Sequence, residues 1–149
     1  MTEKQQLYNF CRTFIDDRIA RIQKNIAGIQ ESLTSETKSS AGDKHETGRA
    51  MLQLEREKLG QQLSEAEKTK QLLSKVSIDQ NSTTAGLGSL VQTTTGNYFI
   101  AISAGEIKID QKTVYCISAI TPIGKAIFGK SVGDTFSFNQ KKGKIESIF

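Results

Sequence analysis

A run of isoleucines in the first half of the chain recurs with the spacing of a helical heptad. Successive apolar residues lie 4, 3, 4, 3 and 4 positions apart at Ile15, Ile19, Ile22, Ile26, Ile29 and Leu33. This spacing places one apolar stripe along a helix and predicts a coiled-coil seam. A second, looser seam follows at Leu52, Leu59, Leu63, Ala66 and Leu73. No proline lies between residues 2 and 76, so neither helix contains a proline break.

The two seams are joined by the polar segment 34–43, which is poor in helix formers. Helices joined in this way should fold back as an antiparallel hairpin. Facing core positions of such a hairpin have residue numbers with a constant sum. Four pairs here share the sum of 85: Leu33 with Leu52, Ile26 with Leu59, Ile22 with Leu63 and Ile19 with Ala66. Two independent patterns need not agree in register, and these two do.

Half of that sum places the tip of the hairpin at Gly42 and Asp43. Arms of about 30 residues would be ~45 Å long. One continuous helix in a parallel coiled-coil dimer is the alternative arrangement. Gly42, Gly48 and the serine-rich stretch disfavour it, because each lowers helix stability.

The second half of the chain alternates apolar and polar residues, with glycine and polar residues between the runs. This pattern predicts short strands at residues 89–93, 98–102, 112–117, 135–138 and 144–148, a turn at Gly96-Asn97, and one short helix over 122–130. The fold class is therefore α+β. We expect a hairpin over residues 1–78, a linker over 79–86, and a small antiparallel sheet domain with one helix over 87–149.

Charge and cysteine usage restrict the possible functions less than the helical pattern restricts the fold. The net charge of +4 is shared equally by the two halves, so neither half is a dedicated basic arm, and DNA is not an expected partner. Cys11 and Cys116 are expected to be buried thiols, and a lone His45 gives no zinc cluster. No apolar run reaches the roughly 18 residues of a membrane span, and the first residues form no signal peptide or lipidation motif. A cytoplasmic protein is expected.

Two motifs in the chain resemble motifs of a known protein family. The tip sequence Ala41-Gly42-Asp43-Lys44-His45-Glu46 matches a Gly-Asp-x-x-Glu pattern. Residues 121–134, which read TPIGKAIFGKSVGD, are similar to a Ser-Pro-(Ile/Leu)-Gly-(Lys/Arg)-Ala-Leu-Leu-Gly-Lys-x-x-Gly-Asp segment. In both motifs, and in the order of hairpin and compact domain, the chain resembles the Gre family of bacterial transcript-cleavage factors.

The resemblance implies what the protein does and which part of the chain carries each step. The hairpin would enter the secondary channel of bacterial RNA polymerase, while the second domain, which resembles the FK506-binding (FKBP) fold, grips the channel rim. Asp43 and Glu46 would help to hold a second Mg²⁺ beside that of the polymerase, and the protruding 3′ segment of the nascent RNA would be hydrolysed. The factor, a monomer with no tightly bound cofactor of its own, would stimulate the polymerase rather than act as an enzyme.

The tip chemistry suits this role. Two carboxylates three residues apart lie on one face of a helix, and Mg²⁺ prefers such oxygen ligands. The same spacing also forms a capping box, with Asp43 as the N-cap and Glu46 at the N3 position. The two interpretations are compatible and both stay open. Lys44, His45 and Arg49 are the candidate tip contacts.

In the second motif, Thr121 and Pro122 fall where the rim-contacting loop of the family lies, and Lys125 and Lys130 follow on the adjacent helix. These four residues are the candidate polymerase contacts. Ile127 and Phe128 are expected to pack in the core instead.

Alternatives remain. After Glu46 the better-known members have Asn-Ala-Glu-Tyr, whereas this chain has Thr47-Gly48-Arg49-Ala50. A channel-binding regulator or inhibitor without cleavage activity is therefore the second hypothesis. A peptidyl-prolyl isomerase or chaperone is the third, although the chain has no tryptophan for the aromatic pocket that such an enzyme needs. A purely structural coiled-coil adaptor would explain the hairpin but not the motif over residues 121–134.

Overall fold

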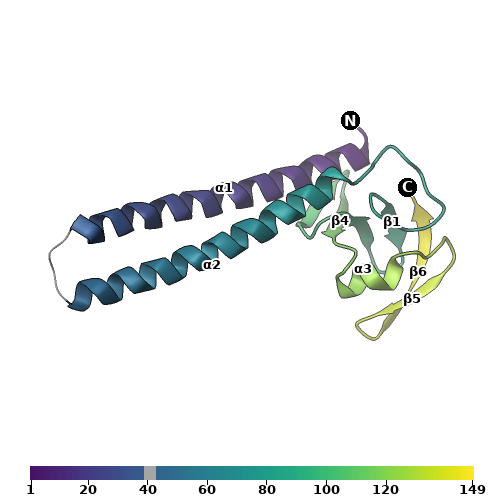
Figure 1. Ribbon diagram of the computed structural model, residues 1–149. Helices are drawn as coiled ribbons and strands as arrows, with labels where there is room; N and C mark the ends of the chain where they lie inside the picture. The colour runs from purple at the N-terminus through teal and green to yellow at the C-terminus, as the bar shows by residue number, and fades with distance from the viewer. Residues whose placement is uncertain (39–42) are drawn as a thin grey trace. The chain divides into compact units, whose positions relative to one another are not determined.

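The computed structural model describes the backbone of residues 1–38 and 43–149, and their side chains except for 37, 38 and 43–45 (Figure 1). The chain divides into two compact units. One unit contains residues 15–70, and the other contains residues 1–14 and 71–149. The first turns of the hairpin therefore share a unit with the sheet. The boundaries expected at residues 78 and 86 stay a prediction. In the described residues, no helix is long and apolar enough to cross a membrane.

Two long helices form the first half of the chain, α1 (Glu3–Lys38) and α2 (Asp43–Ser74). A capping box starts α1, because Thr2 Oγ1 accepts from the Gln5 N–H at 3.1 Å and Gln5 Oε1 accepts from the Thr2 N–H at 2.9 Å. The helix runs further than the polar segment suggested and includes residues 34–38. In this last part of the helix, the Thr34 hydroxyl donates to the Gln30 carbonyl at 3.0 Å.

Residues 15–70 form an antiparallel pair of helical arms (Figure 1). Lys70 Nζ lies 2.7 Å from Asp16 Oδ1, and Glu36 Oε1 lies 3.9 Å from where a Cβ on Gly48 would be. Both contacts fit the expected register within one residue. Ile22, Leu59 and Ala66 of the two seams are buried, with 6%, 7% and 3% of their surface exposed. The antiparallel hairpin is confirmed.

The second half forms a sheet and a short helix, which confirms the α+β class. Its elements are β1 (Leu90–Thr93), β2 (Asn97–Ile100), β3 (Gly105–Ile109), β4 (Lys112–Ile117), α3 (Pro122–Ile127), β5 (Thr135–Phe138) and β6 (Lys141–Ile148). The strand order is β3-β4-β2-β1-β6-β5. The sheet is mixed rather than fully antiparallel, because β4 pairs with β2 in parallel, with Tyr115 opposite Tyr98. The β3–β4 hairpin causes this: β3 runs back along the edge, and β4 fills the place beside β2.

Strand β3 was absent from the prediction, and the turn after it explains why. Asp110 and Gln111 have φ angles of 49° and 68°, and Asn139 and Gln140, between β5 and β6, have 50° and 63°. Two consecutive left-handed residues are typical of a two-residue type I′ turn, which glycine usually supplies. Because neither turn contains glycine, the sequence gives no strong hairpin signal at either place.

The two faces of the sheet are both covered. One face carries the main apolar cluster, formed with α3 by Ala85, Val91, Tyr98, Ile100, Ile117, Ile123, Ile127, Phe136 and Ile145. Leu90, Phe99 and Cys116 pair across the strands on the opposite face. Cys11 of α1 is hydrogen-bonded to Cys116, so the start of the hairpin covers that face. This bond and burial raise the pKa of Cys116 far above its usual range, and both cysteines are buried free thiols as expected.

Candidate functional site: the hairpin tip and helix α3

The acidic pair of the tip lies at the start of α2. The helix begins at Asp43, which places Asp43 and Glu46 in its first turn. The side chain of Glu46 is exposed, whereas those of Asp43, Lys44 and His45 lie outside the described residues. The partial positive charge at a helix start favours carboxylates. This position therefore suits both the capping and the metal-binding hypothesis, and both stay predictions.

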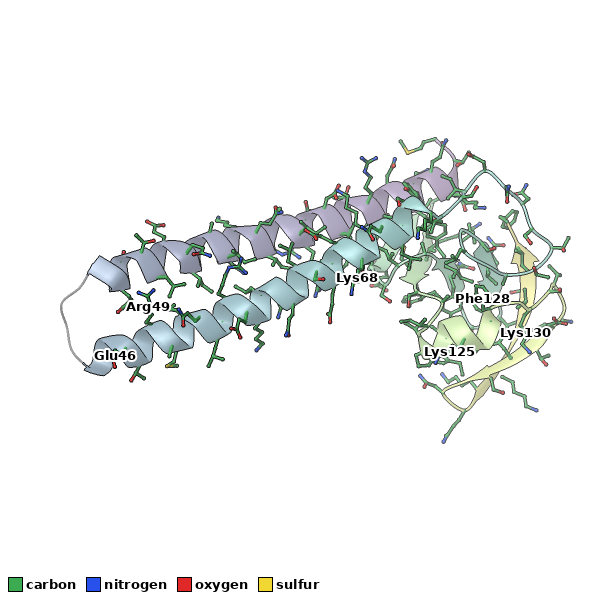
Figure 2. All side chains as sticks on the ribbon, viewed as in Figure 1. Glu46, Arg49, Lys68, Lys125, Phe128 and Lys130 are labelled. Carbon is green, nitrogen blue, oxygen red and sulfur yellow. The ribbon has the colours of Figure 1, made fainter. Side chains whose placement is uncertain are left out.

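One turn further along α2, Arg49 is half-buried and follows Glu46 by three positions. Figure 2 shows both residues on α2 near its first residue. Residues three apart on a helix share a face, so a positively charged residue follows the acidic pair on that face of α2. Among the side chains that the structure describes, no three His, Cys, Asp or Glu residues gather as a metal site. The acidic pair alone offers two carboxylates, fewer ligands than Mg²⁺ takes.

Helix α3 is fixed at its start by Thr121. Its hydroxyl accepts a hydrogen bond from the Gly124 N–H at 3.2 Å and donates one to the Ser118 carbonyl at 2.8 Å. Pro122 follows in the first helical position, where its lack of an N–H costs nothing. Thr121 is thus a capping residue, and the structure gives its hydroxyl two partners inside its own loop.

Several other residues of the motif over 121–134 also have structural roles. A Cβ on Gly124 would collide with the Ser118 carbonyl oxygen, so only glycine lets the helix pack this closely. Gly129 follows the helix with a φ of 79°, the left-handed conformation common after a helix end. Asp134 closes the next turn by accepting the Ser131 N–H at 2.8 Å. The motif therefore specifies a rigid loop–helix–turn unit.

Other members of the motif are presented to solvent. Pro122 and Lys125 are exposed, and Lys130 is half-buried. Figure 2 shows Lys125 on α3, with Phe128 and Lys130 after its last residue. Of the candidate contacts, Pro122, Lys125 and Lys130 are therefore brought together around one short helix.

The expectation for Phe128 was wrong. Ile127 is fully buried as predicted, but Phe128 is 48% exposed. Ile123 and Ile127 are four apart and face the core, so the residue after Ile127 is turned about 100° away from it. This helical spacing was the signal that could have shown Phe128 to be a surface residue.

Two further apolar residues beside α3 were not among the candidates. Ile120 is 80% exposed just before the cap, and Val132 is 57% exposed after the helix. With Phe128 they form the set that we call the α3 apolar residues. They lie before and after the exposed Pro122 and Lys125, so they add apolar residues to the exposed part of this motif.

Comparison with known proteins bears on this domain. Among solved structures, the chain is similar to the GreA factor homolog 1 (Gfh1) protein of Thermus thermophilus, with 18% identity over 93% of this chain and 94% of that chain, and a TM-score of 0.38. A second structure, of the transcription factor Gfh1, gives 19% identity over 92% of each chain and a TM-score of 0.37.

The family comparison is more specific. The curated proteins gave no match. Residues 90–148, however, match the family model of the transcription elongation factor GreA/GreB carboxy-terminal domain. This range runs from β1 through the whole of α3 and β6. Residues 90–148 therefore form a domain of the GreA/GreB carboxy-terminal type.

Proposed function

We propose that this protein binds bacterial RNA polymerase in the cytoplasm, inserts its hairpin in the secondary channel and stimulates cleavage of backtracked nascent RNA. The observation that carries the proposal is the combination of two parts in one chain. A GreA/GreB carboxy-terminal domain over residues 90–148 follows an antiparallel hairpin, and the second helix of that hairpin begins at the acidic pair. The hairpin reaches the reacting RNA, and the domain holds the polymerase.

The tip contributes Asp43 and Glu46. When bound between factor and polymerase, Mg²⁺ supplies positive charge to the attacking water and the leaving oxygen of phosphodiester hydrolysis. The residues of this chain supply charged oxygen ligands on an exposed helix start. Since two carboxylates are too few for a stable site, the other ligands would come from the polymerase, the RNA and water, and free protein should bind Mg²⁺ only weakly.

The docking surface is formed around α3. Pro122 and Phe128 offer exposed apolar contact, and Lys125 and Lys130 offer positive charge beside it. A surface of this kind fits a partner that is apolar at its centre and acidic at its rim. The cap and Gly124 fix the backbone that carries these side chains before binding, which lowers the entropy cost of docking.

The decisive test uses amide variants at the tip. Purified Asp43→Asn, Glu46→Gln and the double variant are added to stalled, backtracked complexes of the cognate polymerase, and RNA length is followed. Asn is still a good N-cap and Gln still serves in a capping box, so the helix should remain stable. A neutral amide is a much poorer ligand for a hard cation. We expect cleavage to be lost and polymerase binding to be kept.

Glu57→Gln is the matched control, because Glu57 is an exposed carboxylate on the same helix but outside the first turn. It should leave cleavage unchanged. Cleavage that persists in the double variant would restrict Asp43 and Glu46 to capping.

A second candidate function rests on Arg49. Arg49 stands one turn after Glu46, where the better-known members have the glutamate of Asn-Ala-Glu-Tyr, so a positive charge replaces a negative one beside the acidic pair. A factor of this kind would occupy the channel without promoting cleavage and would act as a regulator or inhibitor. If wild-type protein binds polymerase and slows elongation without shortening RNA, this candidate replaces the first. Arg49→Ala would then be the variant to test for gained cleavage.

The docking surface is tested separately from the chemistry. The double variant Pro122→Ala, Lys125→Glu and the single variant Phe128→Ser should each weaken polymerase binding by about tenfold or more, since central contacts cost over ~1 kcal/mol. Lys108→Glu on β3 is the charge-matched control, because Lys108 is exposed away from α3. Equal binding by all of these proteins would place the docking surface elsewhere.

A further inference from the structure

The two cysteines of the chain meet inside one compact unit, although they are far apart in the sequence. Cys11 lies on α1 and Cys116 on β4, and their side chains are hydrogen-bonded to each other. Both residues belong to the unit of residues 1–14 and 71–149, which we call the sheet unit. The sequence contains no third cysteine, so each thiol has one possible partner within the chain. Neither the tip chemistry nor the docking surface uses this pair.

The packing of α1 and β4 turns both thiols into the same layer. Leu7 and Cys11 are four apart on α1, and both are fully buried, so this face of the helix points into the sheet unit. On β4, Val114 and Cys116 are buried, whereas Tyr115 between them is exposed. Alternation along the strand therefore places Cys116 on the face that α1 covers. An S–S bond is only about 2 Å long, so a fold can link only thiols that it already holds in contact.

The surroundings of Cys11 favour its thiolate form. Its sulfur accepts one hydrogen bond from the Cys116 thiol and another from the Ile102 N–H. The bond from Cys116 lowers the pKa of Cys11 most and the bond from Ile102 adds to it, although burial opposes both. The same thiol–thiol bond, together with burial, raises the pKa of Cys116. Because the thiolate is the nucleophilic form of cysteine, Cys11 is the sulfur suited to react first, with Cys116 beside it as a thiol.

Access to the pair is narrow, which limits the reagent. Both thiols are buried, so bulky reagents are kept away from them in the folded unit. The first turns of α1 are held in part by two hydrogen bonds of 3.3 Å, from Lys4 Nζ to the Gln80 carbonyl and from the Tyr8 hydroxyl to the Leu73 carbonyl. Both bonds are longer than usual, so brief local opening of these turns costs less than global unfolding. Such openings admit a small oxidant such as hydrogen peroxide.

We propose that Cys11 and Cys116 form a modification site at which a peroxide produces an intramolecular disulfide. First, the Cys11 thiolate attacks one peroxide oxygen and the O–O bond breaks. Cys11 becomes a sulfenic acid, and the leaving hydroxide takes up the proton that the Cys11 thiol released. Next, the Cys116 sulfur attacks the Cys11 sulfur, the S–O bond breaks, and the hydroxyl leaves with the Cys116 proton as water. The two thiols lose two electrons, and the peroxide gains them and ends as two water molecules.

The disulfide changes the stability of the sheet unit. It joins the third turn of α1 to β4 and closes a loop that runs from residue 11 to residue 116. A cross-link over a long loop restricts the unfolded chain strongly, so the oxidised protein should be the more stable form. The proposal is independent of polymerase binding, because it concerns the interior of the unit and not its surface.

The test treats the full-length protein with hydrogen peroxide and maps its disulfide-linked proteolytic peptides. Peptides are mapped because the exposed Met1 and Met51 also take up oxygen. We expect one pair of peptides joined through Cys11 and Cys116, which dithiothreitol separates. The thermal unfolding midpoint of the oxidised protein should be at least about 5 °C above that of the same sample after dithiothreitol, which leaves the methionines matched. Absence of the linked pair, a linkage between two copies of the chain, or an unchanged midpoint would each overturn the proposal.

Two serine variants test the order of the steps. Cys116→Ser keeps a hydrogen-bond donor to Cys11 but removes the second thiol, so peroxide should leave Cys11 as a sulfenic acid that dimedone labels. Cys11→Ser leaves the less acidic thiol, which should give less than about a tenth of that labelling. Circular dichroism checks the fold of each variant, and the wild-type peptide map decides on the disulfide even where a variant unfolds. Equal labelling of the two folded variants would overturn the assignment of Cys11 as the first sulfur to react.

Discussion

In the helical unit, residues 15–70, the buried apolar side chains lie along the two seams, one after another. The most buried of those described are Ile15, Ile22, Leu59 and Ala66. In the other unit, residues from six strands and α3 pack around shared clusters on both faces of the sheet. The helices obtain their hydrogen bonds locally, each from residues four positions away. The sheet obtains its bonds and its packing from residues distant in the chain.

This difference teaches where each unit is vulnerable. A seam position touches few partners, so its loss affects a short stretch of helix. A sheet-core position touches many partners from several strands, so its loss is felt throughout the unit. The unit that carries the tip should therefore tolerate change better than the unit that carries the docking surface.

The largest effect is expected for Phe99→Ala. Phe99 is fully buried on β2, and its removal should lower the free energy of unfolding by about 3–5 kcal/mol through lost burial and a cavity. Denaturant unfolding followed by tyrosine fluorescence measures it, since Tyr8, Tyr98 and Tyr115 all lie in this unit. Phe128→Ala is the matched control and should cost less than about 1 kcal/mol, because Phe128 is 48% exposed. Similar losses for both would break the comparison.

Leu59→Ala should come next. Leu59 is 7% exposed in the seam, and its truncation should cost about 2–3 kcal/mol, at the lower end for leucine because the two-helix layer is thin. Helical circular dichroism at a fixed denaturant concentration measures this loss. Leu54→Ala on the same helix, with 66% exposure, should have almost no effect. A Leu59 variant that destabilises the sheet as much as the helices would show that the two units unfold together.

A smaller effect is expected at the cap of α3. Thr121→Ala removes the oxygen that accepts the Gly124 N–H and should cost about 1 kcal/mol. Thr121→Ser keeps this oxygen and should restore most of the stability in thermal unfolding. If serine and alanine behave alike, the threonine methyl group rather than the cap is what matters.

The smallest effect is expected for the ion pair between the arms. Lys70→Gln breaks its 2.7 Å contact with Asp16, but the two side chains are 51% and 40% exposed. Water and salt screen such a pair, so the cost should stay below about 1 kcal/mol and shrink further in 1 M salt. A salt-independent loss would mean that the lysine contributes by packing of its stem instead.

The sequence allowed accurate prediction where a pattern repeats. The heptad seams predicted the hairpin and its register, because the apolar spacing that defines them recurs along each helix. Prediction was weaker where one turn decides how several strands pair. The parallel pairing of Tyr98 with Tyr115 depends on the β3–β4 hairpin, whose turn at Asp110 and Gln111 uses left-handed residues without glycine.

The candidate site shows the same division. Pro122, Lys125 and Lys130 are gathered around α3 as the motif indicated, because capping and turn residues fix that unit locally. The exposure of Phe128 follows from the spacing of Ile123 and Ile127, a signal that was missed because apolar residues that adjoin in the sequence were taken together as core. At the tip, the metal-binding role of Asp43 and Glu46 depends on ligands from another protein, which this sequence does not contain.

The pairing of β1 with β6 also has a consequence for how the chain folds. Val91 lies opposite Ile148. Strand β1, in the middle of the sheet, can therefore pair with β6 only after residues near the end of this sequence have been synthesised. The contacts of α1 and α2 with themselves form within about a microsecond, whereas pairing across so many residues first pays the entropy of closing a long loop. During synthesis the hairpin should therefore be helical while β1 and β2 still expose an unpaired edge. Mutations that slow the β5–β6 hairpin would lengthen this exposure and promote aggregation without touching the final structure.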